Sequence, residues 1–265
     1  MYPSSLLLAA LPYLILALPR DKNRLAKRDS TLIPTTCFDS TSSLTEYFNY
    51  NYPWGDTHSG AAIMQSSNAV ISTVGTLTLN ATYTGNSDYA YVYGTVYAKQ
   101  QFTVETSGGL DFSADFIAPV ETGTWPAFWL NGVNSWPPEV DIAEWKGTGD
   151  ISFNTNTSSE VTADDVVYPN PTDFHTIPAE LRDANGSDVR ISFYLDRTLI
   201  TTQYAAGLVG QPLNLIIDLQ MEGSSGSTGP TGNSESRGAG QELLIESSSA
   251  IILASSSANS ILTKA

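Results

Sequence analysis

Short runs of alternating apolar and polar residues, separated by Gly, Pro, Asn and Asp, make up most of the chain. The run from Thr76 to Asn80 alternates cleanly, as expected of a β-strand whose side chains point to opposite faces. The sequence shows no long amphipathic helix and no repeat of solenoid length. Further strands are predicted over residues 89–104, 110–118, 127–130, 139–145, 151–154, 174–181 and 214–221, with a hairpin joining 189–196 to 198–203. This series predicts an all-β protein built as an antiparallel sandwich.

The N-terminal segment has the features of an export signal. Leu6 to Leu18 is an apolar run of signal-peptide length, too short to span a bilayer comfortably. The basic stretch that follows ends in Lys27-Arg28, which is typical of a processing site in a secretory pathway, and a flexible basic linker is the alternative. We therefore predict that residues 1–28 are a signal peptide and basic pro-segment. The mature protein is expected to be secreted, either free or associated with the cell wall.

The C-terminal part changes character after about Gly223. Gly and Ser dominate there, with two short apolar islands at 243–245 and 251–253, and no convincing closing strand follows Met221. We predict a folded domain over residues 29–231 and a low-complexity, disordered tail over 232–265. A lipid-anchor signal is the alternative, but it requires a longer terminal hydrophobic stretch than this sequence offers.

The net charge and the cysteine content limit which classes of partner and cofactor the protein can bind. The 12 Lys and Arg and 27 Asp and Glu give a net charge of −15, and removing residues 1–28 leaves 7 basic and 26 acidic residues, or −19. So acidic a chain disfavours nucleic acid and anionic membranes as partners. The single cysteine, Cys37, excludes an internal disulfide and a cysteine-based metal site. The glycosylation acceptors at Asn80, Asn156 and Asn185 agree with secretion. We expect a monomer with no cofactor and no metal site.

The most informative stretch places three carboxylates, Glu139, Asp141 and Glu144, within six residues among Trp and Pro. Simple alternation puts Glu139 and Asp141 on one face of a strand, because the side-chain period is two. Glu144 lies five positions from Glu139 and would point to the opposite face. A β-bulge near Ile142-Ala143 would return Glu144 to the face of the other two acids.

Two carboxyl groups roughly 5–5.5 Å apart are what glycosidic cleavage with retention of configuration needs. One attacks the anomeric carbon, and the other protonates the leaving oxygen and later activates water. A third carboxyl between them can hold the nucleophile by a hydrogen bond. A solvated strand face and a calcium site are the alternatives. Clustered like charges destabilise a strand face, and calcium ligands should come from a loop, so the pattern favours catalysis.

The segment from Glu139 to Glu144 resembles the signature Glu-x-Asp-x-x-Glu of glycoside hydrolase family 16, which also occurs in a form one residue shorter. The segments 123–130 and 136–139 resemble the family's lead-in to the active site, with weaker matches at 51–58, 93–98, 174–176 and 191–196. The resemblance runs from about Phe38 to Met221. It implies a jelly-roll sandwich of two curved antiparallel sheets with a concave substrate cleft. It also implies an endo-acting polysaccharide hydrolase, with a 1,3- or 1,3-1,4-linked β-glucan as the expected substrate.

The resemblance assigns roles to individual residues. It implies that Glu139 is the nucleophile, Glu144 the general acid/base and Asp141 the residue that orients Glu139. Trp125, Trp129 and Trp136 are candidates to stack on sugar rings, whereas Trp145, beside Glu144, can face away. Two polar side chains complete the predicted substrate-binding set, Asn154, which stands where many members have a His, and His175. For His58 and His175 a structural role is the alternative, as core packing is for each Trp.

Other functions are compatible with the same residues. A cell-wall transglycosylase uses the same acids and differs only in whether water or sugar accepts the glycosyl group. A jelly-roll lectin would keep the cleft without turnover, and its hallmark would be the loss of a catalytic acid. An inactive product of a damaged gene is a third possibility, given the unusual tail. All three acids are present, so the sequence favours an enzyme.

Overall fold

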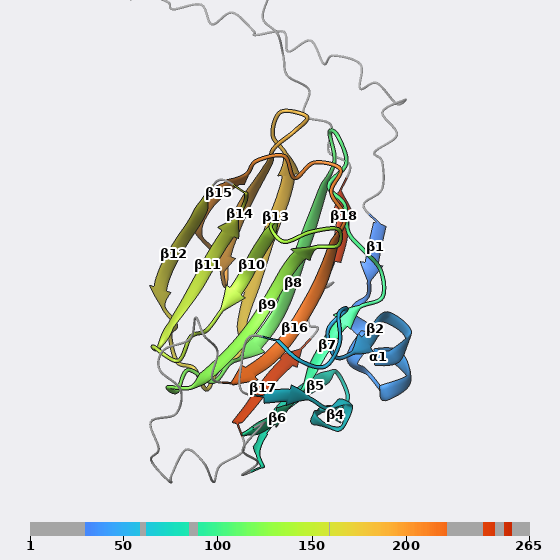
Figure 1. Ribbon diagram of the computed structural model, residues 1–265, viewed down its shortest axis with the longest axis vertical. Coiled ribbons are helices and arrows are strands. Elements are labelled where there is room, and N and C mark those ends of the chain that lie inside the picture. Colours follow the sequence, from blue (N-terminus) through green and yellow to red (C-terminus); the bar gives the residue numbers. More distant parts are fainter. Residues whose placement is uncertain are drawn as a thin grey trace, which may run out of the picture.

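Two β-sheets stacked face to face form the molecule, as predicted (Figure 1). The computed structural model describes residues 30–58, 62–84, 90–158, 160–221, 241–246 and 252–255. All strand pairs in these parts are antiparallel except one, which joins β3 (Ala62–Met64) to β6 (Tyr91–Tyr93). Within the described ranges, no helix is long and apolar enough to cross a membrane. The predicted signal peptide and pro-segment, residues 1–28, lie outside the described residues.

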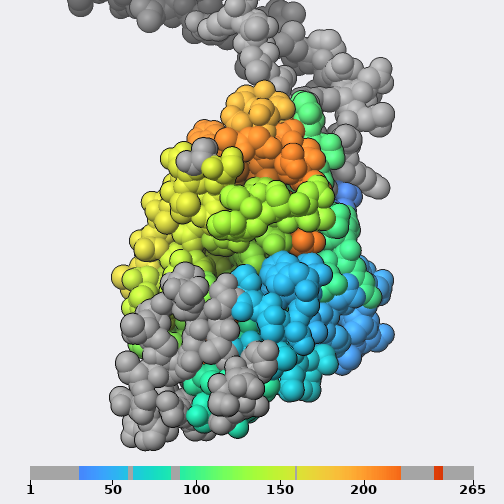
Figure 2. All heavy atoms as spheres, in the orientation of Figure 1, coloured from blue at the N-terminus to red at the C-terminus, as the bar shows by residue number. Residues whose placement is uncertain are grey.

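The seven-stranded sheet runs in the order β12-β11-β10-β9-β16-β7-β2. Its strands are β2 (Phe48–Tyr50), β7 (Thr95–Ala98), β9 (Thr124–Gly132), β10 (Glu139–Glu144), β11 (Asp150–Asn156), β12 (Val161–Val167) and β16 (Leu213–Met221). Figure 2 shows the light-blue segment around residues 50–58 and the lime segment that follows β9 as neighbouring areas on one face of the molecule.

The other sheet contains eleven strands of the described chain, with β15-β14-β13-β8-β17-β5-β6-β3 as its main path. Its strands are β1 (Ser30–Ile33), β3, β4 (Ala69–Thr73), β5 (Thr76–Tyr83), β6, β8 (Gly109–Ile117), β13 (His175–Asp183), β14 (Val189–Leu195), β15 (Thr198–Ala205), β17 (Gln241–Glu246) and β18 (Ile252–Ser255). The short helices are η1 (Thr35–Phe38), α1 (Thr41–Tyr47) and η2 (Ser66–Asn68). The predicted hairpin between β14 and β15 is confirmed.

The core lies between the inner faces of the two sheets. Aromatic pairs join them: the ring centroids of Phe116 and Phe128 are 5.3 Å apart, and those of Phe153 and Phe193 are 5.7 Å apart. Because the central strands of the seven-stranded sheet use one face in this core, their alternate residues point to the other side of the sheet. We call that side the open face.

The structure corrects the sequence prediction at the C-terminus. Residues 241–246 form β17, which pairs with both β5 and β8, and residues 252–255 form β18, which pairs with β8 and β1. Leu243 and Ile245 are completely buried. The prediction of a disordered tail over 232–265 is therefore wrong for these two segments. A three-residue apolar island is too short to reveal a strand, whereas the neighbouring strands β5 and β8 offer backbone groups that require partners.

Strand β12 was also missed by the sequence prediction. It pairs with β11 at the edge of the seven-stranded sheet, and its residues alternate between exposed and half-buried. Val161 and Val167 remain 70% and 76% exposed. An edge strand that packs against one neighbour only shows no buried face, so alternation of hydrophobic residues does not mark it.

Candidate active site

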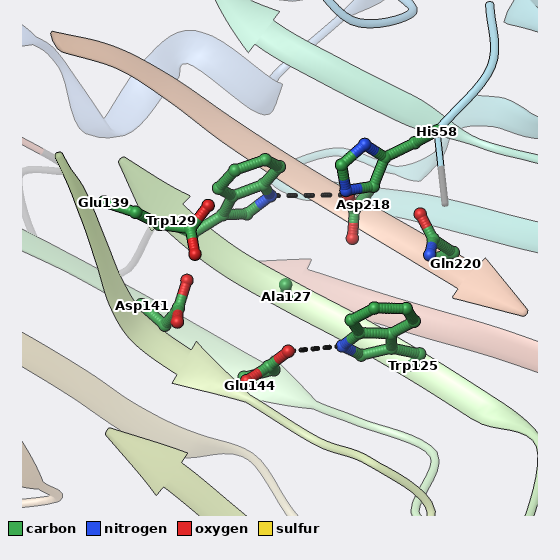
Figure 3. A pocket seen from close by; sticks show the side chains of 9 residues that line it. All are labelled: His58, Trp125, Ala127, Trp129, Glu139, Asp141, Glu144, Asp218 and Gln220. Atoms are coloured by element: carbon green, nitrogen blue, oxygen red, sulfur yellow. Dashed lines mark hydrogen bonds between the residues drawn. The ribbon is translucent and has the colours of Figure 1, made fainter. Parts of the chain in front are cut away.

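A β-bulge in β10 brings the three acids onto the open face, as predicted. Relative to β9, Asp141 pairs with Trp129 and Ala143 with Phe128, so Ile142 is the extra residue. The pairing with β11 shifts between Asp141 and Glu144 as well. Glu139, Asp141 and Glu144 consequently line one cavity of about 50 Å³ (Figure 3).

Glu139 is held by two hydrogen-bond donors. The Trp136 Nε1–H donates to Oε2 at 3.0 Å, and the Asn156 Nδ2–H donates to Oε1 at 2.8 Å. Trp136 precedes β10 in a connection that needs glycine at position 132. A Cβ on Gly132 would lie 2.4 Å from the Ser135 backbone oxygen. Both oxygens of Glu139 are thus fixed by groups from outside its own strand.

Asp141 and Glu144 share a donor on the neighbouring strand. The Asn154 amide on β11 donates to Asp141 Oδ2 at 3.1 Å and to Glu144 Oε2 at 2.8 Å. Glu144 also accepts a hydrogen bond from Trp125 Nε1 at 2.5 Å and forms an ion pair with Lys146 Nζ at 2.6 Å. Asn154 therefore contacts Asp141 and Glu144 in this structure, whereas the sequence prediction placed it against the sugar.

Burial and mutual repulsion raise the pKa of two of the acids, Glu139 and Asp141. Burial raises the pKa of Glu139, and the charge of Glu144 adds to the effect, while the hydrogen bond from Trp136 opposes it. Burial also raises the pKa of Asp141 well above its usual range, with further contributions from Glu139 and Glu144. A protonated Asp141 places no charge between the two glutamates.

Aromatic side chains form the walls beside the acids. A wider hollow of about 460 Å³ adjoins the cavity and is lined by Trp54, His58, Trp125, Trp129, Asn131, Trp136 and Glu139. Trp54 and Trp136 are 46% and 66% exposed, so their rings form an open rim. Trp54 stacks on Tyr52 with the ring planes 6° apart. The predicted tryptophans Trp125, Trp129 and Trp136 thus all reach the cleft.

Two residues considered in the sequence analysis do not reach the cleft. His175 lies on β13 of the other sheet, where its Nδ1 is 3.1 Å from Asp196 Oδ2 and its ring packs against Tyr168. The structure thus corrects the prediction that His175 binds substrate, because its strand belongs to the other sheet and its side chain lines neither the cavity nor the hollow. Trp145 is completely buried and faces the core, as strand alternation allowed.

A polar group on β16 also belongs to the site, although the sequence pattern does not predict it. Asp218 and Gln220 line the same cavity as the three acids, and each is only 2% exposed. Burial raises the pKa of Asp218 to about 7, against hydrogen bonds from Tyr52 and Trp129. A lone acid within the otherwise apolar run from Leu215 to Leu219 was the available signal. The Lys146 and Asn156 contacts to the glutamates were missed too.

Comparisons with known proteins agree with this geometry. No protein-family model matches the sequence. A galactan endo-β-1,3-galactanase of Flammulina velutipes is 46% identical over 216 residues, which cover 77% of this chain and 85% of the relative. The endo-1,3-1,4-β-glycanase ExsH of Rhizobium meliloti (strain 1021) is 26% identical over 167 residues, covering 58% of this chain and 34% of the relative.

Solved structures share the fold. An endo-1,3-β-glucanase from Streptomyces sioyaensis matches with a TM-score of 0.65 at 20% identity, covering 86% of this chain and 95% of that one. A laminarinase from Flavobacterium sp. UMI-01 matches with a TM-score of 0.61 at 21% identity, covering 80% and 93%. At such low identity these matches establish the jelly-roll architecture alone.

The jelly-roll sandwich carries three clustered carboxyls and an aromatic rim on its open face. Together with the 46% identity to an endo-galactanase, these features define the protein as a glycosidase. The extent and identity of the match to the Flammulina velutipes enzyme then fix the family. The chain belongs to glycoside hydrolase family 16.

Proposed function

We propose that the protein is a retaining, endo-acting hydrolase of β-1,3-galactan, with Glu139 as nucleophile and Glu144 as general acid/base. The observation that carries the proposal is the bulge at Ile142, because it gathers both glutamates and Asp141 in one cavity. The 46% identity to a galactan endo-β-1,3-galactanase supports galactan over the β-glucan expected from the sequence.

The reaction would proceed in two displacements. The Glu139 carboxylate attacks the anomeric carbon while the bond from that carbon to the leaving oxygen breaks, and the oxygen takes the proton of Glu144. Water then attacks the glycosyl ester, Glu144 accepts a proton from it, and Glu139 leaves as the carboxylate. The hydrogen bonds from Trp136 and Asn156 position Glu139 for the first attack. Lys146 lies against the Glu144 oxygen that is ionised when the second step begins.

The aromatic rim supports a polymeric substrate. A chain lying across the sheet would contact Trp129 in the hollow and the exposed rings of Trp54 and Trp136 at its edge. Apolar sugar faces pack well on such rings. A transglycosylase would use the same contacts, so the fate of the glycosyl group is an outcome of the assay.

Hydrolysis of a polysaccharide panel tests the proposal. Purified protein is offered β-1,3-galactan, laminarin, mixed-linkage glucan, agarose and chitin, and the products are sized while their anomeric configuration is followed by NMR. We expect internal cleavage of galactan and β-configured first products. Glu139→Gln and Glu144→Gln should each lose about 10³-fold or more in rate. Glu180→Gln, a matched change on the other sheet, should retain full activity. Release of α-configured products, or equal rates in all four proteins, would refute the assigned roles.

The location of the protein is a separate proposal. The apolar run and the Lys27-Arg28 pair support secretion with processing near Asp29, and the protein would act outside the cell as a monomer. N-terminal sequencing of protein from the culture medium tests the processing, and size-exclusion chromatography with light scattering tests the monomer. A mature chain that keeps residues 1–28 would contradict it.

A further inference from the structure

Asp218 and Gln220 form a polar pair on β16, across β9 from the catalytic acids (Figure 3). Asp218 Oδ2 accepts hydrogen bonds from the Tyr52 hydroxyl at 2.5 Å and from Trp129 Nε1 at 3.3 Å. Gln220 Oε1 lies 3.2 Å from the Tyr52 hydroxyl and 3.4 Å from the Tyr93 hydroxyl. One oxygen of each side chain is therefore fixed by aromatic donors.

The remaining polar atom of each side chain has no such partner. Asp218 Oδ1 and Gln220 Nε2 are buried and have no hydrogen bond of ordinary geometry within the described part of the chain. The backbone N–H of Ala127 lies near enough to the Asp218 carboxyl to lower its pKa slightly. Leaving buried polar atoms unpaired costs free energy, so such atoms are uncommon away from functional sites. One atom is an acceptor and the other a donor. A sugar hydroxyl, which both donates and accepts, can satisfy the two together.

The strand register places this pair relative to the reacting centre. Asp218 pairs with Ala127 on β9, and Ala127 pairs with Glu144 on β10. The three residues form a row across the sheet that spans two strand spacings, about 9.6 Å. The small side chain of Ala127 leaves room above the row, and it lines the cavity.

A pyranose ring would lie along this row in one particular orientation. When its anomeric carbon, C1, lies at the glutamates, C4 at the opposite end of the ring faces Asp218 and Gln220. In a 1,3-linked chain the C4 hydroxyl is free, because the linkage uses O3. Galactose and glucose differ only in the configuration at C4. The row thus aligns the reacting carbon at one end with the distinguishing hydroxyl at the other.

We propose that Asp218 Oδ1 and Gln220 Nε2 bind the C4 hydroxyl of the sugar whose anomeric carbon reacts, and thereby select galactan over glucan. This assignment rests on the proposed β-1,3-glycan hydrolysis. Tyr52 and Trp129 act as positioning residues, because they fix the other oxygen of Asp218 and leave Oδ1 directed at the cavity.

Two isosteric variants test the pair. In Asp218→Asn the amide oxygen would keep the contacts to Tyr52 and Trp129, so that an NH₂ donor replaces the acceptor in the cavity. In Gln220→Glu one carboxylate oxygen keeps the tyrosine contacts, and an acceptor replaces the donor. The double variant restores one donor and one acceptor in exchanged positions. Gln211→Glu, an exposed change in the loop before β16, is the control.

The readout is the ratio of kcat/KM for β-1,3-galacto-oligosaccharides to that for β-1,3-gluco-oligosaccharides of equal length. We expect each single variant to lower this ratio about 10- to 100-fold, because a site built around a hydroxyl rejects a mismatched one. The double variant should recover part of the loss, and Gln211→Glu should leave the ratio unchanged. Thermal unfolding checks each variant, and if one single variant does not fold the other decides.

The outcomes separate this inference from the proposed function. If the wild type cleaves galacto-oligosaccharides and both single variants lose activity equally on the two C4 epimers, the pair has a structural role and the inference is overturned. If the wild type cleaves neither epimer, the proposed function fails and this inference fails with it. If kcat/KM of the single variants falls for galacto-oligosaccharides but not for gluco-oligosaccharides, both the proposed function and this inference are supported.

Discussion

Deleting Ala143 should leave the enzyme active, although the deletion shortens the segment between Glu139 and Glu144. On β9, Glu139 pairs with Asn131 and Glu144 with Ala127, so five steps along β10 match four steps along β9. With one residue removed, four steps along β10 match four steps along β9. Simple alternation then keeps both glutamates and Asp141 on the open face, with the second glutamate still opposite Ala127.

The expected cost is small and follows from the register. The four steps along β9 correspond to about 13 Å, and this separation is the same with and without the bulge. Ala143 is fully buried, so its loss removes one methyl group from the interior, worth about 1 kcal/mol of unfolding free energy. A domain of this size should then lose about 2–4 °C in Tm. A misplacement of about 1 Å at the second glutamate would lower the rate about 10²-fold at most.

Kinetics on β-1,3-galactan and thermal unfolding measure both effects. We expect kcat/KM of the deletion variant to stay within about 100-fold of the wild type. Adding Glu144→Gln to the deletion should abolish the remaining activity, which shows that the same carboxyl still acts. A folded deletion variant as inactive as Glu144→Gln alone would refute the idea that face and register position this residue.

Three further predictions concern the site and the core. In a host that attaches N-glycans, the fraction glycosylated at Asn156 should be inactive, because a glycan replaces one N–H of the amide nitrogen that contacts Glu139 and adds bulk beside the carboxyl. Ser158→Ala, which removes the acceptor triplet alone, should raise specific activity. Equal activity of glycosylated and bare protein in mass-resolved fractions would contradict this. Because the pKa of Asp218 is raised, its contribution to stability is complete below about pH 4 and is lost as the pH rises through about 7. Between pH 5 and 8 the wild-type Tm should therefore fall more than the Tm of Asp218→Asn. Parallel Tm curves for the two proteins would contradict this prediction. Trp145→Ala should lower the free energy of unfolding, measured in urea, by about 3–5 kcal/mol, because the side chain is completely buried. A loss below about 1 kcal/mol would show that the core collapses into the space left by the indole ring.

The sequence by itself determined the features that depend on near neighbours. Alternation located most strands of both sheets, because one buried face repeats every second residue. The same rule showed that Glu139 and Asp141 share a face and that Glu144 needs an irregularity, which the bulge at Ile142 supplies. The family resemblance of the segments 123–130 and 136–139 indicated the tryptophans Trp125, Trp129 and Trp136 as cleft residues.

Only the tertiary structure decided which distant segments meet. Asp218 and Tyr52 are 166 positions apart in the chain, yet they share a hydrogen bond in the wall of the cavity. His175 lies on a strand with clear alternation, but alternation does not say which sheet a strand joins, and the other sheet holds it. Strand β17 exists because β5 and β8 leave a ladder for it to complete. Local pattern fixes the faces of a strand, whereas strand pairing fixes its neighbours. The place of Asp218 and Gln220 in the cavity wall depends on those neighbours.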